Sequence, residues 1–227
     1  MLTDSGAVPA DPAARRLQGT VWQGVPLAHI GYSWIRAFGA ILGRSGISAN
    51  TLTLVALALS GLAAATTATG HLWSAATLVL IAGVFDALDG VVARATGTTS
   101  KFGALLDSTV DRFSDALPLI GVLFIYLDHG VLALVPVATL VLAFGVSYVR
   151  ARAEGLGARL PPLFMRRAER TVMMILCLAV GGLIPGDAIP YPVLLVGVGV
   201  IGALSSGGLL AALLAARRAL DTADRAK

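Results

Sequence analysis

Charged residues and cysteine are scarce in this chain of 227 residues. Lysine, arginine, aspartate and glutamate make up 13% of it and hydrophobic residues 56%, whereas an ordinary soluble domain has roughly 25% charged residues. So little charge excludes a surface that faces water everywhere, and lipid is expected to be much of the solvent. The single cysteine, Cys177, excludes a disulfide within the chain and, in its apolar run, is expected to be part of the core.

The apolar residues gather in stretches long enough to cross a bilayer as helices, which takes about twenty residues and satisfies every backbone group internally. There are six, at residues 49–69, 73–95, 102–126, 131–149, 163–184 and 192–215. Because the connections are short, the predicted fold is all-α, a polytopic domain of six transmembrane helices over residues 26–220. Residues 1–25 lack an apolar core with a cleavage site, so a disordered tail is expected there and no signal peptide.

An amphipathic helix is predicted just before the first stretch. Apolar residues recur there at steps of three and four, with two arginines nearby: Leu27, Ile30, Trp34, Phe38 and Ile41, with Arg36 and Arg44. A helix of this kind lies in the membrane interface, where it would anchor the first span.

The 17 basic residues are distributed unevenly between the turns. They lie before residue 49, around the turns at 94–101 and 150–170, at Arg112 and after residue 215, whereas the turns around His71, His129 and Gly186 contain none. By the positive-inside rule, both termini and the two basic turns of this multi-pass protein of the plasma membrane are cytoplasmic. The net charge of +4 thus reflects topology and anionic substrates, and does not call for nucleic acid.

Five aspartates stand inside the second and third predicted spans, where a carboxylate costs about 2.5 to 3.5 kcal/mol on insertion scales. They are Asp86, Asp89, Asp107, Asp111 and Asp115. The pairs 86/89 and 107/111 each share a helix face, at similar depth on neighbouring antiparallel helices. Oxygen ligands without His or Cys select Mg²⁺ or Mn²⁺, and two such ions are the usual apparatus for displacement at phosphorus. The spacing therefore predicts a two-metal site acting on a diphosphate, but it does not separate ligands from a catalytic base.

Residues 86–111 read D-x2-D-G-x2-A-R-x8-G-x3-D-x3-D. This pattern resembles the signature of the CDP-alcohol phosphotransferase family, with every fixed position matched. The resemblance implies a homodimeric membrane enzyme that uses CDP-diacylglycerol. It also implies that Asp86, Asp89 and Asp107 bind the metals, and that Asp111 completes the second site and acts as the base.

The same resemblance implies a CDP-lipid site lined by Asp89, Gly90, Arg94 and Gly103, with Asn50 and Thr53 at the start of the first span. Capping of the first helix by Asn50 is the competing interpretation. Asp115 lies outside the signature, so a structural pairing with Arg112 or a polar neighbour is expected for it.

Arginines surround the turn after the fourth span, where the segments RARAE and RRAER stand. These segments resemble those of bacterial phosphatidylinositol phosphate synthases, whose acceptor is inositol phosphate. The second segment typically reads ERPER there, so this chain departs from it at Arg166 and Ala168. The resemblance implies that the acceptor phosphate is held by five arginines: Arg150, Arg152, Arg167, Arg170 and Arg218.

Other interpretations of these features stay open. The arginines also suit a plain positive-inside anchor, or a phosphatidylglycerophosphate synthase with glycerol 3-phosphate as acceptor, although the lysine-rich K-x-K-T run usual in that enzyme is missing. A divalent-cation or proton transporter would spread its acids through the membrane depth, and here they gather at one face. A scaffold without catalysis would be expected to have a broken signature.

Overall fold

The computed structural model describes residues 34, 37–39 and 41–225, and this part of the chain is helical with no strand. The all-α class predicted from the sequence is therefore confirmed for it. The expected tail at residues 1–25 lies outside the described residues, as do Leu27, Ile30 and Arg36 of the expected interfacial helix. Trp34, Phe38 and Ile41 are described and exposed. The interfacial helix stays a prediction.

From residue 49 on, six α-helices and one short 3-10 helix follow each other along the described chain. They are α3 (Ala49–Ala68), α4 (Leu72–Ala95), α5 (Lys101–Tyr126), the 3-10 helix η1 (Leu127–Ala133), α6 (Leu134–Gly155), α7 (Arg167–Gly181) and α8 (Pro192–Arg225). Each predicted apolar stretch contains one α-helix, and α8 continues about ten residues beyond the predicted end at residue 215.

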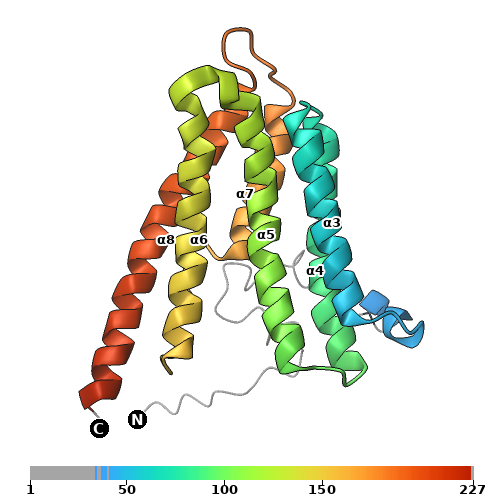
Figure 1. Ribbon diagram of the computed structural model, residues 1–227, viewed down its shortest axis with the longest axis vertical. Helices are drawn as coiled ribbons and strands as arrows, with labels where there is room; N and C mark the ends of the chain where they lie inside the picture. Colours follow the sequence, from blue (N-terminus) through green and yellow to red (C-terminus); the bar gives the residue numbers. More distant parts are fainter. Residues whose placement is uncertain (1–33, 35–36, 40, 226–227) are drawn as a thin grey trace, which may run out of the picture.

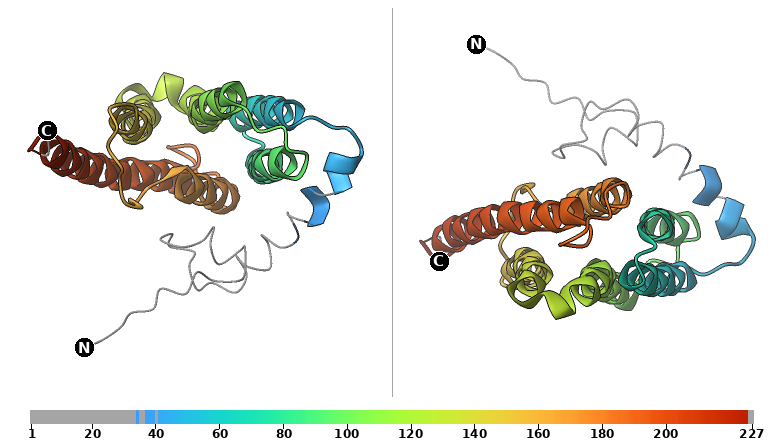
Figure 2. Two further views of the ribbon diagram at one scale, coloured as in Figure 1. Left: turned by 90° about the horizontal axis from the view of Figure 1, so that it is seen from below. Right: turned by 90° about the horizontal axis from the view of Figure 1, so that it is seen from above.

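The helices pack side by side around a closed circuit. Helix α3 packs against α4 and α5, α4 against α7, α7 against α8, α8 against α6, and α6 against α5. Figure 1 shows them running roughly lengthwise and spreading apart toward the lower end, and Figure 2 shows the circuit from both ends. At the lower end lie the first residues of α3 and α5 and the last residues of α4, α6 and α8, while α7 begins near the middle of the bundle. The described basic residues near the turns thus gather in the lower half of the bundle.

The predicted number of six membrane spans is not confirmed by helix length and composition. Four helical runs are long and apolar enough to cross a membrane: α3, α4, the unbroken run Lys101–Gly155 that contains α5 and α6, and α8. Helix α7 has 15 residues, which cover only about 22 Å at 1.5 Å per residue and fall short of a hydrocarbon core of about 30 Å. The run Lys101–Gly155 reverses direction at η1, where Gly130 has a φ of +59°. Six crossings are therefore not confirmed.

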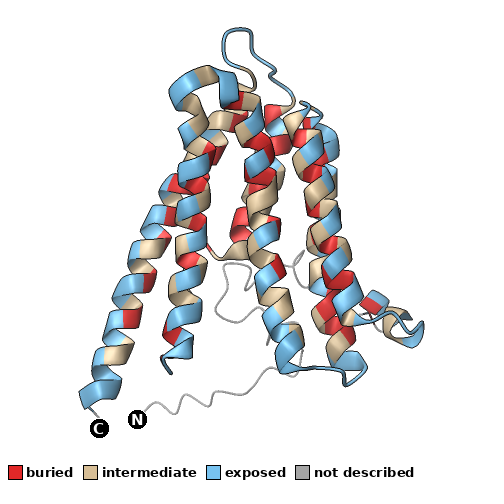
Figure 3. Ribbon diagram, viewed as in Figure 1, coloured by how far each residue is buried: buried red, intermediate tan, exposed pale blue. Residues whose placement is uncertain are grey.

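Large apolar side chains cover the outside of the bundle, as a lipid-facing surface requires. Leu54, Leu80, Phe124, Val141 and Val196 are all more than half exposed. The buried side chains point inward, and Figure 3 shows their stripes along the helices. One core cluster includes Leu72, Val122, Tyr126, Leu178 and Leu194 near the end opposite the basic turns. Cys177 is half-buried and packs beside this cluster, as expected for a core position.

Close packing of α3 and α5 depends on Gly121. A Cβ atom at this position would lie 2.5 Å from the carbonyl oxygen of Ala64 and 3.0 Å from its Cα. These are backbone atoms of α3, so the two helices would have to separate. Small residues allow such close approach between helices inside membranes.

We therefore expect Gly121→Ala to destabilise the protein by about 1 to 3 kcal/mol, the usual cost of overpacking. Thermal unfolding in detergent would measure the change. Gly61→Ala is the matched control, because a Cβ there meets no atom within 4 Å and the site lies on α3 itself. Equal unfolding temperatures for the two variants would contradict this account of the α3–α5 contact.

Candidate functional site

A tight turn joins α4 to α5 and fixes the depth of their aspartates. Gly97 takes a φ of +68°, a conformation that glycine adopts without strain, and the chain reverses there. The side chain of Ser100 then caps α5 by accepting a hydrogen bond from the backbone N–H of Gly103 at 2.9 Å. The last turns of α4 and the first turns of α5 consequently lie at the same end of the bundle.

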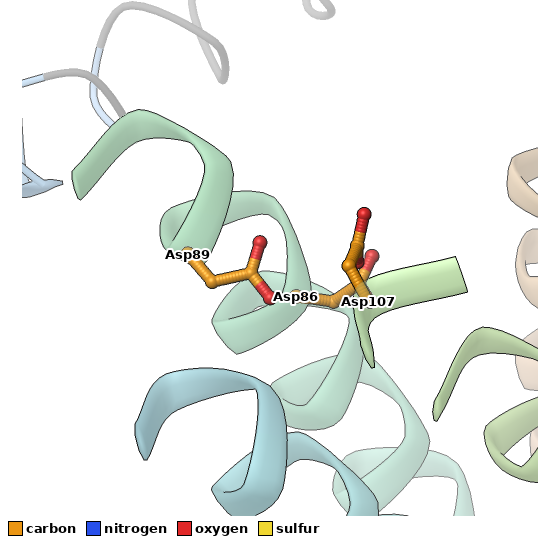
Figure 4. Close-up of side chains that lie close together, drawn as sticks. All are labelled: Asp86, Asp89 and Asp107. Atoms are coloured by element: carbon orange, nitrogen blue, oxygen red, sulfur yellow. The ribbon is translucent and has the colours of Figure 1, made fainter. Parts of the chain in front are cut away.

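Three carboxylates from these two helices lie together. Asp86 and Asp89 of α4 and Asp107 of α5 each offer an oxygen, and these oxygens all lie within 4.8 Å of one another. Figure 4 shows the three side chains close together. Asp89 is buried and the other two are half-buried. Three anionic groups at this separation repel one another, and a cation bound between or beside them would relieve the repulsion.

Thr53 of α3 fixes the deepest member of this group. Its hydroxyl donates a hydrogen bond to Asp89 Oδ2 at 2.6 Å and lies within reach of the Ala49 carbonyl at 3.1 Å. Thr53 and Asp89 are only 3% and 4% exposed. The hydrogen bond ties α3 to the acidic group.

All six residues expected at the CDP-lipid site line one cavity of about 160 Å³: Asn50, Thr53, Asp89, Gly90, Arg94 and Gly103. Asp107 lines it too. Gly103 keeps this cavity open, because a Cβ there would meet Ser100 Oγ at 3.1 Å and Asn50 Oδ1 at 3.6 Å. The capping interpretation of Asn50 is wrong, since Ser48 is the N-cap of α3 and accepts a hydrogen bond from Thr51 N.

Arg167, at the first position of α7, connects Asp86 of α4 to two further aspartates of α5. Its guanidinium Nη1 lies 2.5 Å from Asp86 Oδ2 and 3.0 Å from Asp111 Oδ1, and its Nε lies 3.5 Å from Asp115 Oδ1. One arginine thus bridges carboxylates on α4 and α5, among them Asp111, which is not one of the three grouped carboxylates. Arg167 supplies positive charge that this concentration of acids needs.

A second cavity, of about 350 Å³, opens on the other side of Arg167. Its lining includes Asp111 and Asp115 together with five arginines: Arg112, Arg150, Arg166, Arg167 and Arg170. Three of the five arginines expected to hold an acceptor phosphate are therefore brought together here. Arg152 and Arg218 are exposed on α6 and α8 and do not line this cavity.

Asp115 is held by Arg170, which is 5% exposed and donates hydrogen bonds to Asp115 Oδ2 through Nε and Nη2. This agrees with the structural role expected for Asp115. Arg112, one of the expected partners, donates instead to the backbone carbonyl of Ser108. Sequence reasoning missed Ser147, which accepts from Arg170 Nη2 at 3.1 Å. The signal was a hydroxyl in an apolar run, one turn before Arg150.

Two features of the three-carboxylate group suit a hard divalent cation. Its ligand atoms are all carboxylate oxygens at spacings that suit a shared ion, and Asp86 Oδ1 is a buried oxygen without a hydrogen-bond partner among the described residues. The group within 4.8 Å contains Asp86, Asp89 and Asp107 but not Asp111. These three carboxylates could hold one ion, and a second ion would have to use Asp111 near Arg167.

The fold and the acidic site define a helical membrane protein equipped to bind divalent cations beside a polar cavity. A model of the CDP-alcohol phosphatidyltransferase family matches residues 46–216, and the chain belongs to this family. The family expected from the pattern at residues 86–111 is thereby confirmed.

Relatives of known name are similar over the same region. The chain is 38% identical over 143 residues to an archaetidylinositol phosphate synthase of Methanothermobacter thermautotrophicus, a match that covers 62% of this chain and 70% of the relative. It is 38% identical over 137 residues to a phosphatidylinositol phosphate synthase of Mycobacteroides abscessus, covering 58% and 62%.

Solved structures of a Mycobacterium tuberculosis phosphatidylinositol phosphate synthase have a similar fold. The structure with CDP-DAG bound matches with a TM-score of 0.70 at 28% identity, over 80% of this chain and 92% of that chain. The structure in complex with manganese and citrate matches with a TM-score of 0.71 at 29% identity, over 80% and 88%.

Proposed function

We propose that this protein transfers the phosphatidyl group of CDP-diacylglycerol to inositol phosphate, giving phosphatidylinositol phosphate and CMP. The observation that carries the proposal is the position of the acidic group between two cavities. Asp89 and Asp107 border the cavity of 160 Å³, and Asp111 borders the arginine-lined cavity of 350 Å³. Two substrates that approach from opposite sides would meet at the carboxylates. The names of the relatives support the choice of both substrates.

The smaller cavity would hold the cytidine diphosphate part of the lipid. Arg94 supplies a guanidinium for the diphosphate, and Gly90 and Gly103 leave room for it. Asn50 offers an amide that donates and accepts hydrogen bonds. Thr53 acts differently in this proposal, since its hydroxyl is bonded to Asp89 and therefore orients that carboxylate.

Asp86, Asp89 and Asp107 would hold the first Mg²⁺ or Mn²⁺, and Asp111 would complete a second site with Asp86 and Asp107. Two bound ions would neutralise the diphosphate oxygens and stabilise the attacking and leaving oxygens of the displacement. Support for divalent metal comes from the carboxylate group and from the manganese complex of the Mycobacterium tuberculosis enzyme.

Asp111 would act as the base. It accepts the proton of the acceptor hydroxyl while that oxygen bonds to the phosphorus that carries diacylglycerol. The bond from this phosphorus to the bridging oxygen breaks, and CMP leaves with the bonding electrons. Asp111 is half-buried and borders the acceptor cavity, so a bound hydroxyl group would lie within its reach.

The arginine-lined cavity would bind the phosphate of the acceptor, because guanidinium groups match a phosphate with paired hydrogen bonds. Arg150 and Arg167 border it directly. Arg152 and Arg218 would contribute only long-range positive charge, since they stand outside its lining.

The membrane arrangement completes the proposal. Helices α5 and α6 would cross separately on either side of η1, and α7 with its flanking residues would supply the sixth crossing. The end that carries the described basic turns would face the cytoplasm, with the active site on that side of the plasma membrane. A homodimer is expected from the family resemblance.

The test is an acceptor comparison with purified protein, CDP-diacylglycerol and Mg²⁺. Inositol phosphate, glycerol 3-phosphate, serine and free inositol would be supplied separately, and CMP release measured. We expect inositol phosphate to be used at least about tenfold better than serine and free inositol, because a lost charge-assisted phosphate contact costs roughly 1.5 to 3 kcal/mol. Glycerol 3-phosphate keeps this contact, so its rate relative to inositol phosphate tests the choice of acceptor separately. Preference for glycerol 3-phosphate would make the protein a phosphatidylglycerophosphate synthase. Divalent-ion uptake into vesicles without CMP release would instead support a transporter.

A further inference from the structure

The arginines around the 350 Å³ cavity differ in how much of their hydrogen-bonding capacity is already in use. Arg170 has the least to offer a ligand. It is 5% exposed, and besides Asp115 its guanidinium reaches Ser147 Oγ at 3.1 Å and the carbonyl oxygen of Met165 at 2.6 Å. These bonds occupy all but one of the donors of a guanidinium.

The contacts of Arg170 hold the chain just before α7 in place. Met165 is fully buried and has a φ of +59°, a conformation that is unusual for a residue with a side chain. Its carbonyl would lose its bond if Arg170 turned toward a ligand, and the Asp115 carboxylate would lose its closest partner. Leaving such buried groups unpaired is costly, so Arg170 is fixed in a structural role.

Arg167 and Arg150 are also engaged. Arg167 contacts Asp86, Asp111 and Asp115. Arg150 pairs with Glu154 at 3.2 Å and donates to the carbonyl oxygen of Pro161 at 3.1 Å.

Arg166 is different. Its side chain lines the same cavity and is 31% exposed, and the nearest carboxylate, that of Glu169, lies 3.9 Å from its Nε. This separation is beyond hydrogen-bond distance. Among the described residues, no hydrogen bond donated by the Arg166 guanidinium is found, and the side chain also lies beside the backbone N–H of Glu169 in the first turn of α7.

The backbone of Arg166, unlike its guanidinium, is held by a hydrogen bond. Glu169 is 7% exposed, and its Oε2 accepts a hydrogen bond from the Arg166 backbone N–H at 2.5 Å. Arg166 is also the N-cap of α7, so the positive end of this helix dipole lies at its backbone. A fixed backbone, available guanidinium donors and a positive helix end together favour an anionic ligand in the cavity.

We propose that Arg166 binds the phosphate group of the acceptor and that Arg170, although it lines the same cavity, serves to hold Asp115 and the residues before α7. The proposal rests on the function given above, because it assigns the phosphate-binding side chain of that acceptor site. The ligand class is a phosphomonoester carried by a small hydroxyl compound. An acceptor without phosphate would gain nothing from Arg166.

The test compares Arg166→Gln, Arg166→Lys and a control, Arg217→Gln, in one lipid environment. Arg217 is on α8 at the same end of the bundle, is 79% exposed and pairs only loosely with Asp221 at 3.7 Å. For Arg166→Gln we expect the KM for inositol phosphate to rise about ten- to a hundredfold, with kcat and the KM for CDP-diacylglycerol within a few-fold of their original values. Arg166→Lys should recover only part of this loss, because an ammonium cannot form the paired contact. Arg217→Gln should leave all three constants unchanged.

Two further measurements make the outcome decisive. Thermal unfolding should be unchanged by Arg166→Gln and clearly lowered by Arg170→Gln, whose loss leaves Asp115 and the Met165 carbonyl unpaired. Calorimetric titration with inositol phosphate and with inorganic phosphate, without CDP-lipid, reports binding independently of turnover. If the unaltered protein uses inositol phosphate and Arg166→Gln keeps its KM, the inference is overturned while the proposed function stands. If inositol phosphate is not a substrate but phosphate binding depends on Arg166, the function is wrong and the phosphate site remains.

Discussion

Asp86→Asn is expected to reduce CMP release by about a thousandfold or more, because the metal contribution at such a site amounts to several kcal/mol of transition-state stabilisation. Asp86 belongs to the three-carboxylate group and has one buried oxygen without a hydrogen-bond partner in the described chain. Asn keeps the shape but removes the charge and one oxygen ligand. CMP release in saturating Mg²⁺ and calorimetric titration with Mn²⁺ in detergent would measure the two effects.

A second variant separates loss of metal from loss of an ion pair, since Asp86 also contacts Arg167. Asp107→Asn should give a similar loss, because Asp107 belongs to the carboxylate group but forms no ion pair with Arg167 within 4.0 Å. Asp128→Asn is the control, as Asp128 is exposed in η1 at the other end of the bundle. Chelation should stop the unaltered enzyme, and Mg²⁺ or Mn²⁺ should restore it. Full activity of Asp107→Asn would remove the metal site from the mechanism, whereas rescue by Zn²⁺ alone would contradict the assignment of this site to a hard cation.

The second large effect is expected for Asp111→Asn. Asn cannot accept the proton of the acceptor hydroxyl, so kcat should fall by about a hundredfold or more, as for loss of a general base. Affinity for CDP-diacylglycerol should change little, because the lining of the 160 Å³ cavity does not include Asp111. Single-turnover rates and lipid binding by the same preparation would give both quantities.

Asp115→Asn is the comparison for this prediction. Asp115 lies one helical turn further along α5 and also contacts Arg167, so a general disturbance of Arg167 would affect both variants alike. We expect the Asp115 variant to lose thermal stability, through its bonds to Arg170, and to lose much less of its turnover. A turnover change below about threefold for Asp111→Asn would exclude it as the base.

Several features of this protein follow from the linear sequence because they depend on short-range spacing. The helices can be found because an apolar run must form a helix to satisfy its backbone in lipid. The common depth of Asp86, Asp89 and Asp107 follows from two helices joined by a short turn. The six residues that line the 160 Å³ cavity could be named because most belong to one continuous pattern around that turn. Spans were harder to count, since α7 is shorter than its apolar stretch.

The sequence by itself therefore determined the helical class, the family pattern and the acidic group. Only the tertiary structure decided which long-range partner each charged side chain has. The chain shows six arginines around one turn, but a guanidinium sits on a long flexible side chain, and its partners come from other helices. Because α7 packs against α4, Arg167 of α7 contacts Asp86 of α4. Because α5 and α6 lie next to each other, Arg170 of α7 binds both Asp115 of α5 and Ser147 of α6. These contacts span from 23 to 81 residues along the chain, so no local spacing rule could assign them.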